Sequence, residues 1–187
     1  LLDIVQAGFN EEQPKFISAS GGKWYLEDNR ETPDTLKVTY EYPSVFIATY
    51  ENRNNNGQSL SLFDKSYGIL FYGTNGTMFV DRSEYFILPE LKAEPGQDLK
   101  VPMMQASSMK SVSGGNFNHW KNFVSCIKSR ELPTSDIGIC QKSTATCLLG
   151  NVALRTGERL EFDASKQTVT EPKLHKWLTR EYRHPWK

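Results

Sequence analysis

The sequence lacks the features that mark membrane-spanning and nucleic-acid-binding proteins. In 187 residues, no apolar run approaches the ~20 residues that a membrane span needs. Twenty-two basic residues balance twenty-two acidic ones, so the chain has no net charge with which to attract a polyanion. No signal peptide is in view, although one on an upstream segment would not be visible. We therefore expect a soluble chain without nucleic-acid or membrane partners, and the choice between cytoplasm and periplasm stays open.

Cysteine is scarce and its spacing is unsuited to cross-linking. The three cysteines are Cys126, Cys140 and Cys147, an odd number without a C-x-x-C pair. Cys140 and Cys147 are seven positions apart in a predicted helix, which separates them by about 10 Å along its axis. That distance is too long for a disulfide. We expect three buried free thiols that behave as small apolar side chains.

The motifs of catalysis and cofactor binding are also missing. His119, His175 and His184 are scattered without metal-ligand spacing, so we expect no metal site. The sequence contains neither a G-x-G-x-x-G nor a G-K-[ST] phosphate loop, and the glycines of "SASGGKW" predict a turn. No G-x-S-x-G elbow is present, and no cysteine has a nearby histidine to activate it. From chemistry alone, the sequence offers no set of residues in a catalytic arrangement.

The first two-thirds of the chain predicts a sheet. Residues 34–43 alternate, with Leu36, Val38, Tyr40 and Tyr42 on one face. Asn75-Gly76 between two apolar runs predicts a tight hairpin. Further strands are expected at 15–22, 45–53 and 84–90.

The last third predicts helices after a linker at 93–115. Phe117, Trp120, Val124 and Ile127 give an apolar stripe that ends near Arg130. A second helix begins at a Ser135 cap and ends at Gly157. A strand or hairpin is expected at 159–169, followed by a helical turn at 174–178.

These elements predict an α+β fold: a large, mostly antiparallel open sheet of about six to eight strands with helices packed on one face. Neighbouring residues of a strand point to opposite faces, so the strand aromatics cannot all face one helical layer. We expect the other face to be used for oligomerisation, and hence a homo-oligomer. The aromatics that support this inference are Phe46, Tyr50, Phe71, Tyr72, Phe79 and Phe86.

Polar residues at four places are candidates for a site. They are Asp3 at the start of an apolar helix, the charge-rich segment 28–35, Asn52 and Arg53 at the end of a strand, and His119 in the first turn of a helix. A structural or solvent-exposed role stays open for each of them.

The beginning of the chain resembles the middle of a helix. Leu1, Leu2, Ile4 and Val5 form an apolar stripe that Gly8 ends, and no capping residue precedes them. We expect this helix to begin upstream, in a longer polypeptide.

Four segments in order resemble the C-terminal part of Gfo/Idh/MocA family oxidoreductases. They are 18–43, 119–137, 143–163 and 176–186, so the resemblance covers nearly the whole chain. Gln141 stands where many relatives have a histidine, and any role of that histidine is not carried over.

The resemblance implies that residues 1–187 form a single C-terminal substrate-binding and oligomerisation domain of a longer oxidoreductase, with residues 1–8 the remainder of a truncated helix. In this family an N-terminal Rossmann domain binds NAD or NADP and carries the catalytic lysine. Leu1-Leu2-Asp3 matches the end of the family's D-x-x-x-H-x-x-D motif, which puts the catalytic histidine just upstream. This chain alone would then hold no catalytic and no cofactor-binding residue, and it would bind no cofactor.

The implied activity is hydride transfer between the nicotinamide cofactor and a sugar or polyol. Asp3 is the best candidate for a substrate contact, and Asn52, Arg53 and His119 are weaker ones. Two alternatives remain open: a free-standing, non-catalytic ligand-binding or interaction domain derived from the family, and, with no positive support, an enzyme of another class such as a glycosidase that uses paired carboxylates.

Overall fold

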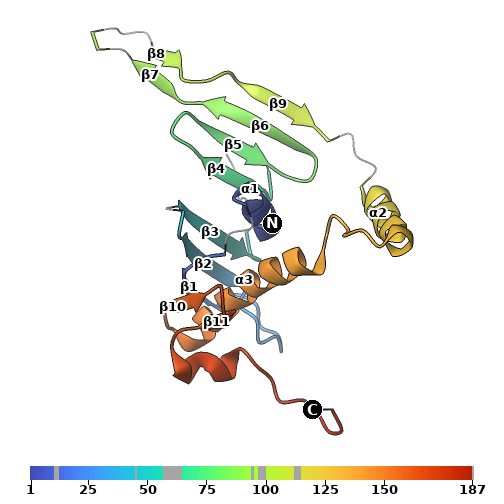
Figure 1. Ribbon diagram of the computed structural model, residues 1–187. Coiled ribbons are helices and arrows are strands. Elements are labelled where there is room, and N and C mark those ends of the chain that lie inside the picture. The colour runs from blue at the N-terminus through green and yellow to red at the C-terminus, as the bar shows by residue number, and fades with distance from the viewer. Residues whose placement is uncertain are drawn as a thin grey trace. The chain divides into compact units, whose positions relative to one another are not determined.

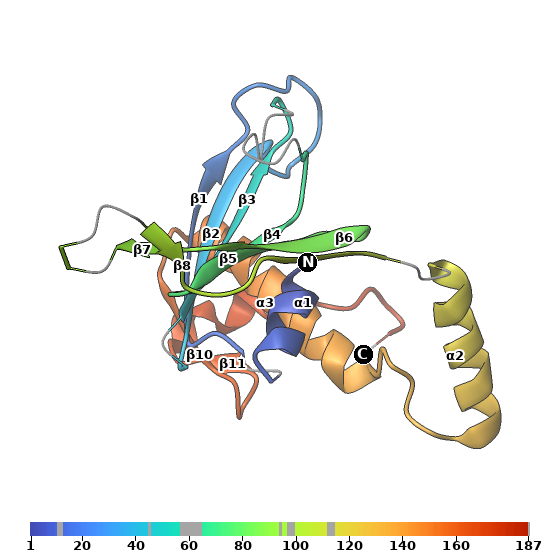
Figure 2. The same cartoon turned by 90° about the horizontal axis from the view of Figure 1, so that it is seen from above.

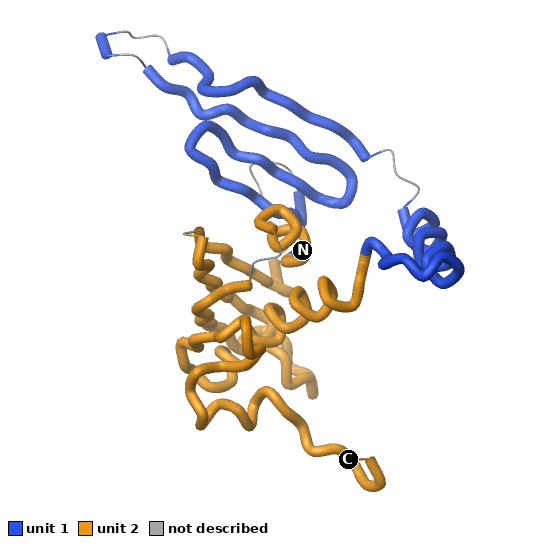
Figure 3. Tube along the Cα trace, in the orientation of Figure 1, with its two compact units in different colours: residues 1, 58–134 blue, residues 2–57, 135–187 orange. Residues whose placement is uncertain are grey.

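The computed structural model describes residues 1–10, 13–44, 46–56, 65–93, 95–96, 100–111 and 115–186. It confirms the α+β class, and every strand pair among these residues is antiparallel (Figures 1 and 2). The chain divides into two compact units (Figure 3). Unit 1 holds residues 1 and 58–134, and unit 2 holds residues 2–57 and 135–187.

Unit 2 contains a five-stranded sheet in the order β11-β10-β1-β2-β3. Its strands are β1 (Phe16–Gly22), β2 (Thr35–Tyr42), β3 (Phe46–Arg53), β10 (Leu160–Asp163) and β11 (Thr168–Val169). Its helices are α1 (Leu2–Gly8), α3 (Ile137–Thr156) and the short 3₁₀ helix η2 (Pro172–Trp177).

Unit 1 contains a four-stranded sheet in the order β4-β5-β6-β9 and a two-stranded ribbon, β7-β8. These strands are β4 (Ile69–Tyr72), β5 (Gly76–Val80), β6 (Glu84–Pro89), β7 (Leu91–Ala93), β8 (Lys100–Pro102) and β9 (Ser107–Lys110). Helix α2 (Asn116–Ser129) follows. The strands therefore outnumber the six to eight expected and belong to three sheets.

The core of unit 2 lies between one face of its sheet and α3. The predicted alternation of β2 is confirmed, because Val38, Tyr40 and Tyr42 are buried while Lys37 is exposed. Helix α3 approaches this face so closely that a Cβ on Gly150 would lie 2.8 Å from the Tyr40 hydroxyl oxygen. Only glycine permits this distance, so Gly150 sets how closely helix and sheet pack.

The second face differs between the two larger sheets. In unit 2 it is mostly polar, and Ser18, Lys37, Thr39 and Glu41 share it by register. The expected apolar second face is therefore wrong for this sheet, because Phe46 and Tyr50 pair with Tyr42 and Val38 and share their face. The four-stranded sheet does carry apolar residues on both faces: Leu70, Phe79 and Phe86 on one, and Phe71, Met78 and Ile87 on the other.

Helix α1 confirms the predicted apolar stripe only at Val5. Leu1 and Ile4 are exposed, whereas Val5 and Gln6 are buried. The Gln6 side chain is fully buried, and both ends of its amide form hydrogen bonds to α3. Its Nε2 donates to Thr146 Oγ1 at 2.8 Å, and Ser143 Oγ donates to its Oε1 at 2.8 Å. A polar side chain with its hydrogen bonds satisfied thus anchors α1 to α3.

The predicted linker at 93–115 contains two strands, β8 and β9. All their residues are exposed, so no burial pattern marked them, and they are held by backbone pairing with β7 and β6. Residues 94, 97–99 and 112–114 of this segment, and residue 45 of the predicted strand 45–53, lie outside the described residues.

The Asn75-Gly76 hairpin is confirmed between β4 and β5, and both long helices form close to their predicted bounds. Asp136 caps α3 in place of Ser135, because its side chain accepts the Gly138 amide hydrogen, and Gly157 ends the helix at a positive φ of 67°. None of the residues of α2 is buried. No helix of the described chain combines the length and apolarity needed to cross a membrane.

The three cysteines are free thiols, but they are not buried. Cys126 and Cys140 are half-buried and Cys147 is exposed. The expectation of three buried thiols is therefore wrong: Cys126 belongs to α2, which buries no residue, and the two cysteines of α3 keep part of their surface exposed.

We expect Gly150→Val to lower the free energy of unfolding by ~2 kcal/mol, because the new methyl groups would overlap Tyr40 and Val38. Urea unfolding measures this change. Thr144→Val, at an exposed position of the same helix, is the matched control and should leave the midpoint nearly unchanged. Equal midpoints for Gly150→Val and the unmodified chain would show that the helix has room to move away.

Candidate functional site

The four predicted site residues lie in both units. In unit 2, Asp3 is exposed in the first turn of α1, and Asn52 and Arg53 are half-buried at the end of β3. The Arg53 guanidinium lies 3.9 Å from the Glu51 carboxylate. His119 is exposed on α2 in unit 1.

Within unit 2, the residue just after α1 contacts the opposite end of β3 from Asn52 and Arg53. The Phe9 ring stacks on Phe46, the first residue of β3, with ring centroids 4.0 Å apart. Asn52 follows six residues later, about 20 Å along an extended strand. This contact therefore does not bring the end of α1 to the predicted strand-end site.

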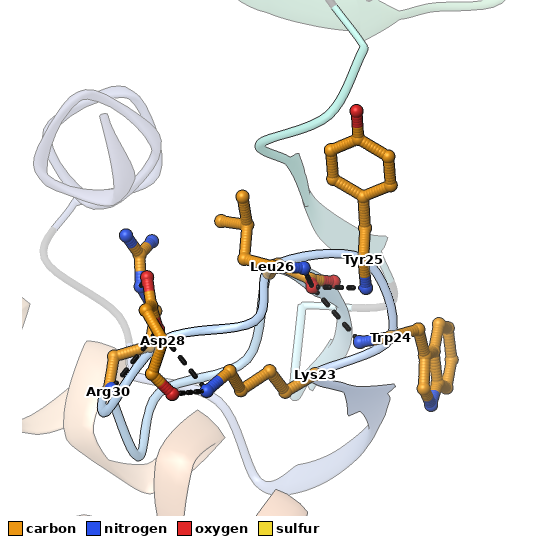
Figure 4. Close-up of polar contacts among 7 residues, drawn as sticks. Lys23, Trp24, Tyr25, Leu26, Asp28 and Arg30 are labelled. Carbon is orange, nitrogen blue, oxygen red and sulfur yellow. Dashed lines mark hydrogen bonds and ion pairs between the residues drawn. The ribbon is translucent and has the colours of Figure 1, made fainter.

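The charge-rich segment 28–35 belongs to a loop that joins β1 to β2 and is organised by Asp34. This carboxylate is fully buried, and its Oδ2 accepts hydrogen bonds from the backbone N–H groups of Trp24, Tyr25 and Leu26 at 3.0, 2.7 and 2.9 Å (Figure 4). The N–H groups of Leu26 and Tyr25 stabilise the charged form and lower the pKa of Asp34 to about 2. Asp34 therefore fixes the loop and is not free to bind a ligand.

Asp28 organises the other side of the same loop. Its side chain accepts the Arg30 amide hydrogen at 3.1 Å and lies 2.6 Å from Arg30 Nε and 3.2 Å from Lys23 Nζ (Figure 4). Asp28 thus pairs with Arg30 of the same segment and with Lys23 at the start of the loop. Asp28, Arg30 and Asp34 therefore serve the loop's own structure, whereas Glu31 forms no ion pair with a described residue.

The glycine pair at the end of β1 leaves space for this loop. A Cβ on Gly21 would lie 2.4 Å from the Thr35 carbonyl oxygen, and one on Gly22 would lie 2.4 Å from the indole nitrogen of Trp24. The Trp24 side chain thus lies against the Gly22 backbone, although 73% of it is exposed. The close packing around Gly21 and Gly22 therefore explains why glycine occurs at both positions.

Loop 23–34 contributes one wall of a cavity of about 460 Å³ in unit 2, which we call the α3 cavity. Helix α3 forms its floor, and the end of η2 forms another wall. It is lined by Glu31, Thr32, Pro33, Gln141, Ala145, Leu148, Leu149, Asn151, Val152, Leu154, Arg155, Phe162, Gln167, Trp177 and Leu178.

A chain of glutamines holds the β10–β11 turn at the wall of this cavity. Gln141 Nε2 donates to Gln167 Oε1 at 2.8 Å, and Gln167 Nε2 donates to Gln13 Oε1 at 2.6 Å. Gln13 Nε2 in turn reaches the Lys142 carbonyl oxygen at 3.4 Å. Gln141 is therefore a structural hydrogen-bonding residue.

The α3 cavity is suited to binding. Its floor and walls are mostly apolar, and among the described residues that line it only Glu31 and Arg155 are ionisable. Such a set can hold an apolar group and pair with charges of either sign, but it supplies no nucleophile with an adjacent base. Within the described ranges, His, Cys, Asp and Glu side chains form no group of three that could hold a metal.

This cavity was not predictable from local sequence patterns, because its walls come from segments more than a hundred positions apart. One signal was present: α3 has apolar residues beyond the stripe that faces the sheet, and Leu148 is 55% exposed. A helix that is apolar around more than one face is expected to contact a second partner.

No protein-family model and no curated protein matches the sequence. Solved structures do match. A provisionally assigned oxidoreductase from Thermotoga maritima has a TM-score of 0.59 at 14% identity, over 84% of this chain and 43% of its own. An Agrobacterium radiobacter oxidoreductase solved with NAD⁺, L-tartaric acid and magnesium has a TM-score of 0.55 at 8% identity, over 85% of this chain and 46% of its own.

The WlbA dehydrogenase from Bordetella pertussis, solved with NADH and UDP-GlcNAcA, has a TM-score of 0.50 at 10% identity. The match covers 87% of this chain and 42% of WlbA. The chain thus spans less than half the length of each of these three proteins. This chain therefore shares the fold of one part of these oxidoreductases.

We expect Asp34→Asn to release the loop that forms one wall of the α3 cavity. The neutral amide holds three N–H groups more weakly than a carboxylate, so the Trp24, Tyr25 and Leu26 amides should exchange hydrogen faster. Hydrogen exchange followed by mass spectrometry measures this. Asp163→Asn is the matched control, because that carboxylate also has a pKa lowered to about 2 but holds the turn at Ser165.

We also expect the effect of Asp34→Asn on stability to depend on pH. The folded pKa of Asp34 lies below its unfolded value, so its contribution to stability is present above about pH 4 and is lost as the pH falls towards 2. The difference in unfolding free energy between Asp34→Asn and the unmodified chain should therefore be largest near pH 7 and shrink in acid. A difference independent of pH would contradict this role of the charge.

Proposed function

We propose that this chain is the C-terminal part of a longer NAD(P)-dependent oxidoreductase that acts on a sugar or polyol, and that it contributes part of the substrate pocket and the subunit interface. The observation that carries the proposal is the fold. It matches oxidoreductases over 84–87% of this chain while spanning only 42–46% of theirs.

The ligands of two matched structures support the reaction class. One was solved with NADH and UDP-GlcNAcA, and the other with NAD⁺ and L-tartaric acid. In each case a nicotinamide cofactor accompanies a compound rich in hydroxyl groups. Oxidation of a hydroxyl carbon passes a hydride to the nicotinamide and a proton to a base. The resemblance puts the cofactor site and that base in the upstream part of the polypeptide.

The role of this chain would be recognition of the substrate. The Asp3 carboxylate is exposed and can accept hydrogen bonds from substrate hydroxyls. Hydrogen bonds to the substrate can be donated by Asn52, Arg53 and His119. We propose that these three residues surround one substrate only in the assembled enzyme. The four-stranded sheet, with apolar residues on both faces, supports a homo-oligomer formed through a sheet.

The first test is the mass of the native polypeptide in the source cell, detected with an antibody against this chain. Our proposal predicts a band roughly twice the 21.3 kDa of this chain or larger. That polypeptide should bind NADH, and the 187 residues alone should not. A band near 21.3 kDa would favour the free-standing binding domain, and saturable NADH binding by this chain alone would contradict the upstream cofactor site.

In the longer polypeptide, Asp3→Asn should lower kcat/KM for the sugar or polyol by about tenfold or more, because an amide accepts hydrogen bonds from hydroxyls more weakly than a carboxylate. The KM for the cofactor should not change. Asp28→Asn is the control, since Asp28 is paired with Lys23 and Arg30 in loop 23–34. Unchanged kinetics would return Asp3 to a solvent-facing role.

A further inference from the structure

The segment that follows η2, residues 179–186, carries binding surface that the rest of unit 2 does not use; we call it the arm. All eight residues are exposed, and Tyr182 and Trp186 are each 73% exposed. Figure 3 shows the arm leaving the remainder of unit 2. Its one backbone hydrogen bond outside regular structure runs from the Trp186 amide to the Arg183 carbonyl oxygen at 2.9 Å.

The side chains of the arm form no ion pair, hydrogen bond or ring contact within the described part of the chain. Arg180, Glu181 and Arg183 form no ion pair there, and neither aromatic ring packs on another ring. Tyrosine and tryptophan are the residues that most often anchor protein interfaces, because each buries a large area at a small entropic cost. Two of them on one exposed arm indicate a binding segment.

The α3 cavity is a matching acceptor. Its volume of about 460 Å³ lies within the range of ligand pockets, and two of its lining residues, Leu148 and Trp177, are 55% and 41% exposed. Packing an aromatic ring against them would remove this apolar surface from water. The cavity therefore offers the kind of surface that Tyr182 and Trp186 would bury.

The charges of the arm and the cavity are complementary in both signs. The cavity carries Glu31 and Arg155, and neither forms an ion pair with another described residue. The arm presents Arg180 and Arg183, which can pair with Glu31, and Glu181, which can pair with Arg155. Because the arm offers an opposite charge to both Glu31 and Arg155, the cavity should bind the arm in preference to a purely apolar segment.

We propose that the arm of one copy of the chain docks in the α3 cavity of a second copy. The arm begins directly after Leu178, which lines its own chain's cavity, but no arm residue lines that cavity and all of them are exposed. The arm therefore starts at the edge of the cavity. Two copies related by a twofold axis can exchange their arms, so that each gives one contact and receives one.

Sedimentation velocity over a range of concentrations tests this proposal on the intact chain. We expect a concentration-dependent dimer whose Kd rises about tenfold or more in Trp186→Ala and in Leu148→Glu, because each removes one side of the contact. Both positions are exposed, so the fold should be retained. Trp24→Ala is the matched control, since Trp24 is also 73% exposed but lies on loop 23–34.

Mixing the two weakened variants identifies the exchange. Leu148→Glu keeps an intact arm and Trp186→Ala keeps an intact cavity, so the mixture should form a heterodimer with one of the two contacts restored. A peptide of residues 179–186 should bind Trp186→Ala and fail to bind Leu148→Glu.

Two results would overturn the proposal. One is a chain that stays monomeric throughout, and the other is a dimer that neither substitution weakens. An unaffected dimer would point to association through a sheet, as the proposed function expects, so failure of the arm contact and failure of the proposed function are distinguishable. The arm proposal requires neither NADH binding nor the longer polypeptide.

Discussion

Unit 2 depends on the close approach of α3 to its sheet, and this approach is possible because residue 150 has no side chain. A Cβ there would meet the Tyr40 hydroxyl at 2.8 Å and the Val38 methyl groups at 3.2 Å. With the helix so close, Leu149 and Ala153 are buried as well. Helix α3 then serves as the surface to which other segments attach: Gln6 fastens α1 to it, Gln13 reaches its Lys142 carbonyl, and its second face is the floor of the α3 cavity. A change in helix position would alter all these contacts together.

The sequence predicted those parts of the fold whose signal is local. The alternation in 34–43, the Asn75-Gly76 turn and the Gly157 stop each act over a few residues, because strand period, turn type and helix end are set by neighbouring dihedral angles and side chains. Burial of Gln6 was missed because its partner Thr146 lies 140 positions away, and a glutamine beside apolar residues carries no sign of a distant acceptor. Strands β8 and β9 were missed because backbone pairing alone holds them, and exposed side chains leave no period of two.

The candidate site was less predictable, because it depends on which polar groups are already satisfied. The sequence correctly marked 28–35 as having more charge than a turn needs, but charge does not distinguish a ligand site from a loop that binds its own backbone. Three backbone N–H groups donate to one oxygen of Asp34, so this carboxylate belongs to a loop that binds its own backbone. The cost of burying this carboxylate is offset by those bonds, and the result is a fixed wall formed by Glu31, Thr32 and Pro33.

Two tryptophans with the same exposure show how differently one side chain can be presented. Trp24 lies against Gly22 on a loop that Asp34 holds, so its position is set before any partner arrives. Trp186 lies on an arm with a single backbone hydrogen bond, so docking must order the arm as well as bury the ring. Ordering a residue's backbone costs about 1–2 kcal/mol, and this cost reduces the free energy left for association. The exchange of arms is therefore a contact of moderate affinity whose occupancy follows the concentration of the chain, whereas loop 23–34 contributes a wall that is present at every concentration.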